Sequence, residues 1–201
     1  MDDIVRQALA KWPNVPACYG WLMLDRRGNW RMRDEAVQRA GGLGSPVRHA
    51  ALIAFIVRNY DVDERGQWYF QNGPQRVYIE LEYTPFVVRL SQDAQADAAL
   101  VLADQCGTRW EPQGCWVDDR GAVVFTGRVA DDPRPRVGVL HDHDLDLFSD
   151  FVEDVVPGDA PPEFAWSKDH VLAMTSVRFD DVPARFGFVR SPAELADSPA
   201  S

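Results

Sequence analysis

The stretch that decides the fold is residues 63–82, DERGQWYFQNGPQRVYIELE. It predicts two aromatic-rich strands, each preceded by a turn. The second turn falls at residues 72–74, because Asn and Gly tolerate positive φ while Pro fixes its own φ and removes a donor. The apolar and polar residues of the second strand alternate, with Val77, Ile79 and Leu81 on one face and Arg76, Tyr78, Glu80 and Glu82 on the other. This alternation predicts an antiparallel sheet with one buried face.

The stretch begins with a short phrase, apolar-Asp-x-Arg-Gly, that occurs three times in the chain. The three copies are residues 24–28, 62–66 and 117–121. A carboxylate beside an Arg in a tight turn can be read as catalytic. A turn module is the stronger interpretation, because Asp accepts hydrogen bonds from turn backbone and Gly supplies the left-handed position. The phrase therefore predicts three hairpin turns.

The order of predicted elements is similar in the two halves of the chain: hairpin, main helix, strands. Hairpins are predicted at residues 18–33, 63–82 and 115–125; helices at 2–11, 45–60 and 144–156; a loop at 34–45; and further strands at 86–90, 99–103, 108–110, 136–140, 164–166, 171–179 and 184–189. Ser45 and Pro46 are a favoured N-cap and first helical residue. The order predicts an α+β fold of two related small domains, each a mostly antiparallel sheet packed on one main helix.

The domain boundary is predicted in the polar, alanine-rich residues 91–99. The charge also changes there: residues 1–90 hold 12 Lys and Arg against 10 Asp and Glu, and residues 91–201 hold 9 against 21. The net charges are therefore +2 and −12, which sum to the −10 of the chain. We predict an N-terminal domain at 1–90, an acidic C-terminal domain at 91–190 and a flexible tail at 191–201.

The composition favours a cytoplasmic protein. The cysteines, Cys18, Cys106 and Cys115, are odd in number and contain no C-x-x-C pair, which argues for a reducing compartment. The longest apolar run is too short to span a membrane, and the N-terminus lacks the features of a signal peptide. No P-loop, G-x-G-x-x-G or G-x-S-x-G is present. We therefore expect no cofactor and lean against an enzyme.

Five segments together resemble a bacterial family of domains of unknown function. They are residues 28–30, 46–48, 63–69, 77–82 and 85–88. The resemblance covers residues 18–90, and the rest of the chain by the order of its elements. It implies a duplicated α+β core, a C-terminal domain similar to a pleckstrin-homology fold, and a ligand site at the domain interface for a nucleic-acid-based ligand. It implies no established activity.

Cationic and aromatic residues of the first half form the first candidate site. Arg binds phosphate and aromatic rings stack on bases, so a sheet face that carries both can hold a nucleotide-like ligand. The candidate ligand-binding residues are Arg31, Arg33, Arg48, Trp68, Arg76 and Tyr78. The alternative is a purely structural role, with Trp30 pointing into the core, away from Arg31 and Arg33. The acidic chain makes a polynucleotide an unfavourable partner.

The run of residues 141–146, HDHDLD, is the second candidate site. His141, His143 and Asp144 are residue types that bind divalent metals. The competing interpretation is helix capping by Asp142 or Asp144. The sequence favours capping, and no metal is predicted as the first choice.

Three functions remain open from the sequence. The preferred one is a ligand-binding or signalling module for a small anionic or nucleotide-like ligand, with its site between the two halves. The second is a metal-dependent hydrolase that uses residues 141–146. The third is a homodimeric interaction protein that pairs through a strand edge or an aromatic face.

Overall fold

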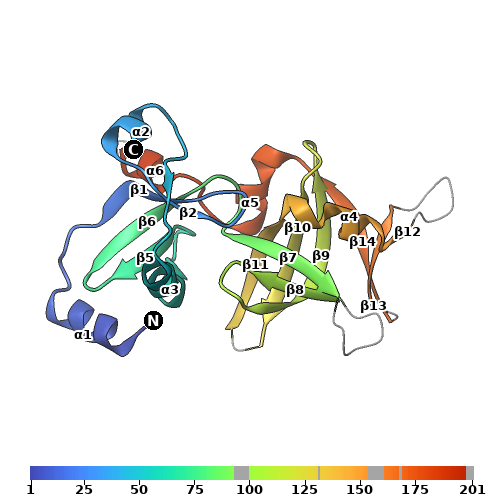
Figure 1. The fold of residues 1–201 in the computed structure, drawn as a ribbon, viewed down its shortest axis with the longest axis horizontal. Helices are drawn as coiled ribbons and strands as arrows, with labels where there is room; N and C mark the ends of the chain where they lie inside the picture. The colour runs from blue at the N-terminus through green and yellow to red at the C-terminus, as the bar shows by residue number, and fades with distance from the viewer. Residues whose placement is uncertain (93–99, 131, 154–160, 168, 198–201) are drawn as a thin grey trace. The chain divides into compact units, whose positions relative to one another are not determined.

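The computed structural model describes residues 1–92, 100–130, 132–153, 161–167 and 169–197, and the chain divides into two compact units (Figure 1). The first unit is Met1–Pro85 together with Gly187–Ser201, and the second is Phe86–Phe186. The second unit is therefore inserted into the chain of the first. The boundary predicted after residue 90 falls inside a strand of the second unit, and residues 93–99 of the predicted linker lie outside the described residues.

A six-stranded sheet organises the first unit. Its strands are β1 (Cys18–Leu24), β2 (Trp30–Met32), β3 (Ser45–Pro46), β4 (Tyr60–Val62), β5 (Trp68–Asn72) and β6 (Gln75–Leu81). Their order across the sheet is β3-β2-β1-β6-β5-β4. The hairpin predicted at residues 63–82 is β5–β6, in which Tyr69 lies opposite Tyr78. On its other side β6 pairs in parallel with β1, which the sequence did not predict.

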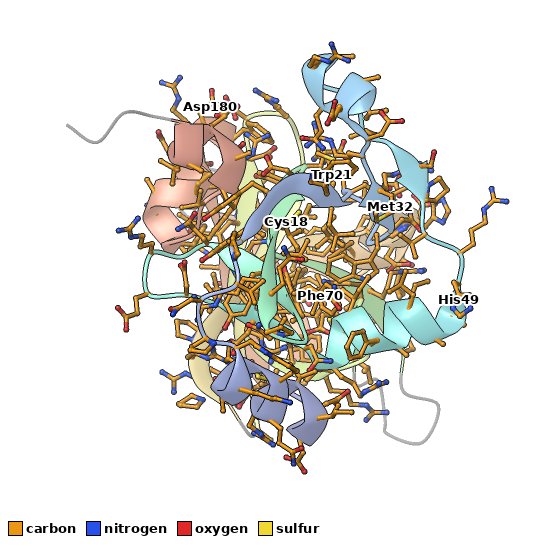
Figure 2. All side chains as sticks on the ribbon, turned by 90° about the vertical axis from the view of Figure 1, so that its left-hand side faces the viewer. Cys18, Trp21, Met32, His49, Phe70 and Asp180 are labelled. Atoms are coloured by element: carbon orange, nitrogen blue, oxygen red, sulfur yellow. The ribbon has the colours of Figure 1, made fainter. Side chains whose placement is uncertain are left out.

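Both faces of the sheet at the β5–β6 hairpin are covered. On one face, the ring of Phe55 in α3 (Ala50–Arg58) packs edge-on against Phe70, with 5.3 Å between ring centroids. Figure 2 shows Phe70 among the packed side chains of this unit and His49 at the free end of α3. On the opposite face, α6 (Pro192–Asp197) lies against β1 and β6 (Figure 1). The prediction of a single buried face was therefore wrong, and Tyr78 and Glu80 are each only 6% exposed.

The main helix of the first unit begins later than predicted. Ser45 and Pro46 form β3, which pairs with β2, and the backbone N–H of Val47 donates to the Trp30 carbonyl at 2.8 Å. These bonds hold the segment extended. The N-cap of α3 is His49, whose Nδ1 accepts from the Leu52 backbone N–H at 3.3 Å. The predicted N-terminal helix is confirmed as α1 (Asp3–Lys11), and the predicted loop at 34–45 contains α2 (Glu35–Arg39).

The second unit is built on a closed five-stranded barrel. Its strands are β7 (Phe86–Gln92), β8 (Leu100–Asp104), β9 (Arg109–Asp118), β10 (Val123–Val129) and β11 (Asp132–Leu140). Neighbouring strands pair antiparallel, and β11 returns to β7 in parallel to close the barrel. An odd number of alternating strands requires one such parallel pair. Both sides of the barrel wall carry apolar side chains: Val124 and Phe125 of β10 are fully buried, and Phe125 packs against Phe148 and Phe164 outside the barrel.

A short sheet extends the barrel from β9. It contains β14 (His170–Val177), β13 (Glu163–Ser167) and β12 (Val152–Glu153). The helices of this unit are short: η1 (Asp142–Asp144), α4 (Leu145–Ser149), η2 (Phe179–Asp181) and α5 (Val182–Phe186). The helix predicted at 144–156 thus ends at Ser149, and its residues 154–156 lie outside the described residues. The strand predicted at 184–189 was wrong, because it starts inside α5.

The α+β class is confirmed, but the two units have different sheets. One is an open six-stranded sheet with α3 packed on it, and the other is a barrel with a three-stranded extension. The architecture gives no support to the predicted duplication or to the likeness to a pleckstrin-homology domain. The predicted tail also differs, because residues 192–197 of it form α6. Residues 198–201 lie outside the described residues.

The repeated phrase forms the three predicted turns, and a fourth turn shares their geometry. In each, one Asp oxygen accepts from the backbone N–H groups two and four residues later, at 2.8 to 3.0 Å. The turn aspartates are Asp25, Asp63, Asp104 and Asp118. The Gly three residues later has φ between 77° and 81°, in the left-handed region. The turn at Asp104 has no Arg, so the phrase did not reveal it and the Arg is not needed for the turn.

The second oxygen of Asp25, of Asp63 and of Asp104 binds a side chain. Oδ2 of Asp25 accepts from Nε of Arg31 at 2.6 Å, and Oδ2 of Asp63 accepts from the Tyr78 hydroxyl at 3.1 Å. Oδ2 of Asp104 accepts from Nε1 of Trp110 at 2.9 Å and from Nη1 of Arg136 at 2.8 Å. Each of these turn carboxylates therefore also positions a side chain of the adjoining sheet.

The substitution Asp104→Ala tests this double role. The Asp104 side chain is fully buried. Its removal leaves the mostly buried Arg136 and the Trp110 N–H without their acceptor, so we expect the free energy of unfolding to fall by about 3 kcal/mol or more. Urea denaturation measures the change. Asp3→Ala, at a side chain that is 84% exposed, is the control and should change stability by less than about 0.5 kcal/mol. Equal effects of the two substitutions would contradict the double role.

Candidate functional site

A pocket of about 430 Å³ opens in the first unit where β4, β5 and β6 meet the turn at residues 63–66. Its lining residues are Val62, Asp63, Glu64, Arg65, Tyr69 and Arg76. We call it the tyrosine pocket. Tyr69 and Arg76 alternate with Phe70 and Val77, and Phe70 packs on α3, so Tyr69 and Arg76 project from the opposite face of the sheet.

Arg76 is held in place by two tyrosines. Its guanidinium lies over the ring of Tyr69, 4.6 Å from the centroid. A hydrogen bond with the Tyr78 side chain raises the pKa of Arg76. In the part of the chain that the structure describes, Arg76 forms no ion pair with a carboxylate. It is therefore a fixed, half-buried cation beside a pocket.

The pocket carboxylate Asp63 is already fully engaged. Its Oδ1 accepts from the backbone N–H groups of Arg65 and Gln67, both at 2.9 Å. Its Oδ2 accepts from the Tyr78 hydroxyl and, at 3.2 Å, from Nε2 of Gln67. Tyr78 thus donates to Asp63 through its hydroxyl and also raises the pKa of the neighbouring Arg76. The carboxylate orients the cation through the hydroxyl and does not pair with it directly.

The aromatic rings around the pocket pack against one another. Tyr19 of β1 stacks on Tyr78, with centroids 4.7 Å apart and an interplanar angle of 5°. Tyr69 meets Tyr78 edge-on at 5.9 Å and carries Arg76 over its ring. Burial raises the pKa of both Tyr69 and Tyr78, so both phenols are neutral at physiological pH. The ring faces of Tyr78 and Tyr69 are therefore covered by other side chains.

Two of the six predicted ligand residues, Arg76 and Tyr78, come together at this pocket. Asp63 and Tyr69 line it as well, and neither is among the six predicted ligand residues. The signal for Tyr69 is its alternation with Trp68 and Phe70. The alternation assigns Tyr69 to the same face of the sheet as Tyr78 only once the register of β5 against β6 is known.

The other four predicted residues lie elsewhere in the first unit. Arg31 is bound to Asp25, and its Nη1 donates to the Gly44 carbonyl at 3.1 Å. Arg33 is buried, and its Nε donates to the Gly42 carbonyl at 2.9 Å. Both arginines therefore hydrogen-bond the backbone of residues 42–44, which follow α2. Arg48 is exposed next to the N-cap of α3, and Trp68 packs against Tyr60 on the α3 face, with centroids 4.7 Å apart.

The second predicted site, residues 141–146, begins a helix. The N-cap of η1 is His141, whose Nδ1 accepts from the His143 backbone N–H at 3.1 Å. Asp144 accepts from Nε and Nη2 of Arg89 at 2.6 and 2.8 Å and from the Leu90 backbone N–H. Capping was the favoured interpretation, but the capping side chain is His141 and not an Asp. No group of three metal-ligating side chains occurs among the described residues.

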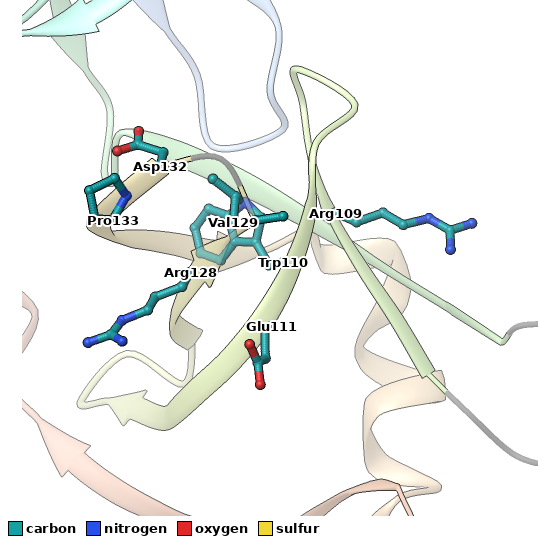
Figure 3. A pocket seen from close by; sticks show the side chains of 8 residues that line it. Arg109, Trp110, Glu111, Arg128, Val129, Asp132 and Pro133 are labelled. Atoms are coloured by element: carbon teal, nitrogen blue, oxygen red, sulfur yellow. The ribbon is translucent and has the colours of Figure 1, made fainter.

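A larger pocket, of about 620 Å³, lies at one end of the barrel in the second unit (Figure 3). Trp110 forms part of its wall and is fixed by its bond to Asp104. Figure 3 shows Arg109 and Arg128 projecting in opposite directions, away from each other. The cations of this pocket therefore do not converge on one point, in contrast to the fixed Arg76 of the tyrosine pocket.

These features define a class: an α+β protein in which a five-stranded barrel unit is inserted into a sheet unit that carries a tyrosine-bound arginine. The chain matches the model of the family DUF2944, described as "Protein of unknown function (DUF2946)", over residues 1–193. It belongs to this family. The resemblance to a bacterial family of unknown function is thus confirmed. No curated protein matches the chain.

The chain matches solved structures of DUF1285 family proteins. One, from Silicibacter pomeroyi DSS-3, has a TM-score of 0.51 and 15% identity, over 86% of this chain and 94% of that chain. Another, from Shewanella baltica OS155, has a TM-score of 0.43 and 12% identity, over 65% of this chain and 91% of that one. The first supports the fold alone. Within the described ranges, no helix has the length and apolar character needed to cross a membrane.

The Asp144–Arg89 pair gives a prediction about pH. Burial opposes the charged form of Asp144, but the bonds from Arg89 and Leu90 outweigh it and hold the pKa of this carboxyl below its ordinary value of 3.8. A carboxyl whose pKa is lower in the folded than in the unfolded protein stabilises the fold above about pH 4. This stabilisation is lost as the pH falls through the pKa of the folded state. Asp144→Asn should therefore lower the free energy of unfolding by about 1 to 2 kcal/mol at pH 7.

The cost should shrink as the pH is lowered below 4, because the wild-type carboxyl then becomes neutral as well. Urea denaturation at several pH values measures it. Asp146→Asn is the control, on the exposed side of α4. A cost that stays constant from pH 7 to pH 3 would contradict the role of the charge.

Proposed function

We propose that this protein binds a small oxyanion, such as a phosphate or carboxylate group, through Arg76 in the tyrosine pocket. The observation that carries the proposal is the state of Arg76. It is half-buried, stacked on Tyr69, next to Tyr78 on the same strand face and not paired with a carboxylate in the described chain. A cation fixed in this way meets an anion without first losing its own side-chain freedom.

The chemistry of guanidinium favours an oxyanion as the ligand. Its planar N–H groups match two oxygens of one carboxylate or phosphate, and charge-assisted hydrogen bonds of this kind are stronger than neutral ones. Arg65, at the exposed turn of the same pocket, adds a second positive charge at the entrance. The exposed Glu64 also lines the pocket and disfavours ligands that carry several negative charges.

The anionic group, rather than a base, is the part of a nucleotide-like ligand that this pocket suits. The stacking faces of Tyr78 and Tyr69 are occupied by Tyr19 and Arg76, so they offer little area for a base. The ligand class is therefore a small anion, including the phosphate of a larger molecule. We place the protein in the cytoplasm, a proposal supported by three cysteines that are all free thiols.

The test is a titration with inorganic phosphate, sulfate and acetate at constant ionic strength, followed by calorimetry or by NMR of the pocket amides. We expect saturable binding of at least one of these anions by the wild type. Arg76→Gln should weaken it by about 10-fold or more, because charged hydrogen bonds are lost. The anion affinity of Arg76→Lys should lie between those of the wild type and Arg76→Gln. Lysine keeps the positive charge but lacks the paired N–H groups of the guanidinium.

The matched control is Arg48→Gln, which removes a cation that is exposed and outside the pocket. It should leave the affinity unchanged. Equal binding by wild type and Arg76→Gln, or no saturable binding of any of the three anions, would rule out the proposed function.

A further inference from the structure

The chain returns from the second unit to the first as a strap, residues 187–193, that bonds two elements next to the tyrosine pocket, the turn at residues 63–66 and the strand β6. The N–H of Val189 donates to the Gly66 carbonyl at 2.9 Å, and the Arg190 carbonyl accepts from the Leu81 N–H at 2.8 Å. Gly66 closes the turn at residues 63–66, while Leu81 belongs to β6. The strap therefore links the turn to the strand that carries Arg76 and Tyr78.

The contact with the turn is close. Gly66 has φ of 77°, and a Cβ on it would collide with the Gly187 carbonyl oxygen. The N–H of Gly66 donates to the Asp63 carbonyl at 3.1 Å, so the residue that touches the strap also fixes the start of the turn. Displacement of Gly66 would therefore move Asp63, and with it the acceptor of the Tyr78 hydroxyl.

The contact with β6 depends on one buried carboxylate. Both oxygens of Glu80 accept from the strap, one from the Ser191 hydroxyl at 2.6 Å and the other from the Ala193 N–H at 3.2 Å. Glu80 lies two and four residues from Tyr78 and Arg76, on the same face of β6. Arg190 adds a bond from Nη2 to the Glu82 carbonyl at 3.0 Å. Phe188 and Pro192 are buried, so the strap also has apolar anchors.

We propose that docking of the strap regulates the tyrosine pocket. The docked strap keeps the turn at 63–66 against β6, in the arrangement that joins Asp63 to Tyr78 and Tyr78 to Arg76. Oxyanion binding and strap docking are then reciprocally coupled: the anion stabilises the docked strap, and a loosened strap lowers the affinity for the anion. This inference rests on the proposed oxyanion site, and it adds Glu80 and Ser191 as positioning residues that do not touch the ligand.

The test combines binding with hydrogen exchange. Ser191→Ala removes the hydroxyl that binds Glu80, and Glu80→Gln is a second variant that keeps the shape of the side chain. With the oxyanion that the wild type binds as probe, each variant should bind about five-fold more weakly or worse, the lower end of usual coupling factors. The probe should also slow exchange of the Val189 and Ala193 amides in the wild type. Ser191→Thr, which keeps a hydroxyl, should restore the affinity.

A ligand-free measurement makes the inference testable by itself. Without any probe, the amides of Gly66 and Gln67 should exchange faster in Ser191→Ala than in the wild type, and those of Ser149→Ala, a variant in the second unit, should match the wild type. Unchanged exchange at Gly66 and Gln67 in both strap variants overturns the coupling. Equal probe affinity of the wild type and both variants also overturns it while leaving the oxyanion site intact. Failure of the wild type to bind any anion defeats the site and the coupling together.

Discussion

The interaction on which most of this structure depends is a carboxylate that uses its two oxygens for different tasks. One oxygen of Asp25, Asp63 or Asp104 closes a turn, and the other binds a side chain of the adjoining sheet. The turn fixes the carboxylate, because two backbone N–H groups of the turn donate hydrogen bonds to one of its oxygens. The side chain that it recruits is thereby fixed as well. A local turn thus positions side chains that lie up to 32 residues away in the sequence, as Asp104 positions Arg136.

The identity of the recruited side chain decides whether a cation stays available. Where the carboxylate binds an arginine directly, as Asp25 binds Arg31 and Asp104 binds Arg136, the two charges neutralise each other. At Asp63 a tyrosine hydroxyl stands between the carboxylate and the arginine. Arg76 is then oriented without being neutralised. The same turn module therefore builds the core in one hairpin and a candidate anion site in another.

The sequence revealed what depends on neighbours along the chain. Alternation in residues 77–81 predicted the hydrophobic face of β6, and the Asp and Gly spacing predicted three turns whose bonds all lie within five residues. It failed where a distant strand decides the outcome. Ser45 and Pro46 suit a helix start, but pairing with β2 takes them into β3. For the same reason Arg31 and Arg33 could not be told from Arg76, since their partners come from turns and loops that only the folded chain brings near.

Insertion of the barrel between Pro85 and Gly187 also has a consequence for the order in which this protein is made. During synthesis the sheet of the first unit emerges before the barrel, and the strap that bonds Gly66, Glu80 and Leu81 emerges after it. The whole barrel sequence is translated in between, and contacts across so long a separation form slowly. The nascent first unit therefore lacks its contacts with the strap until the whole barrel has been translated.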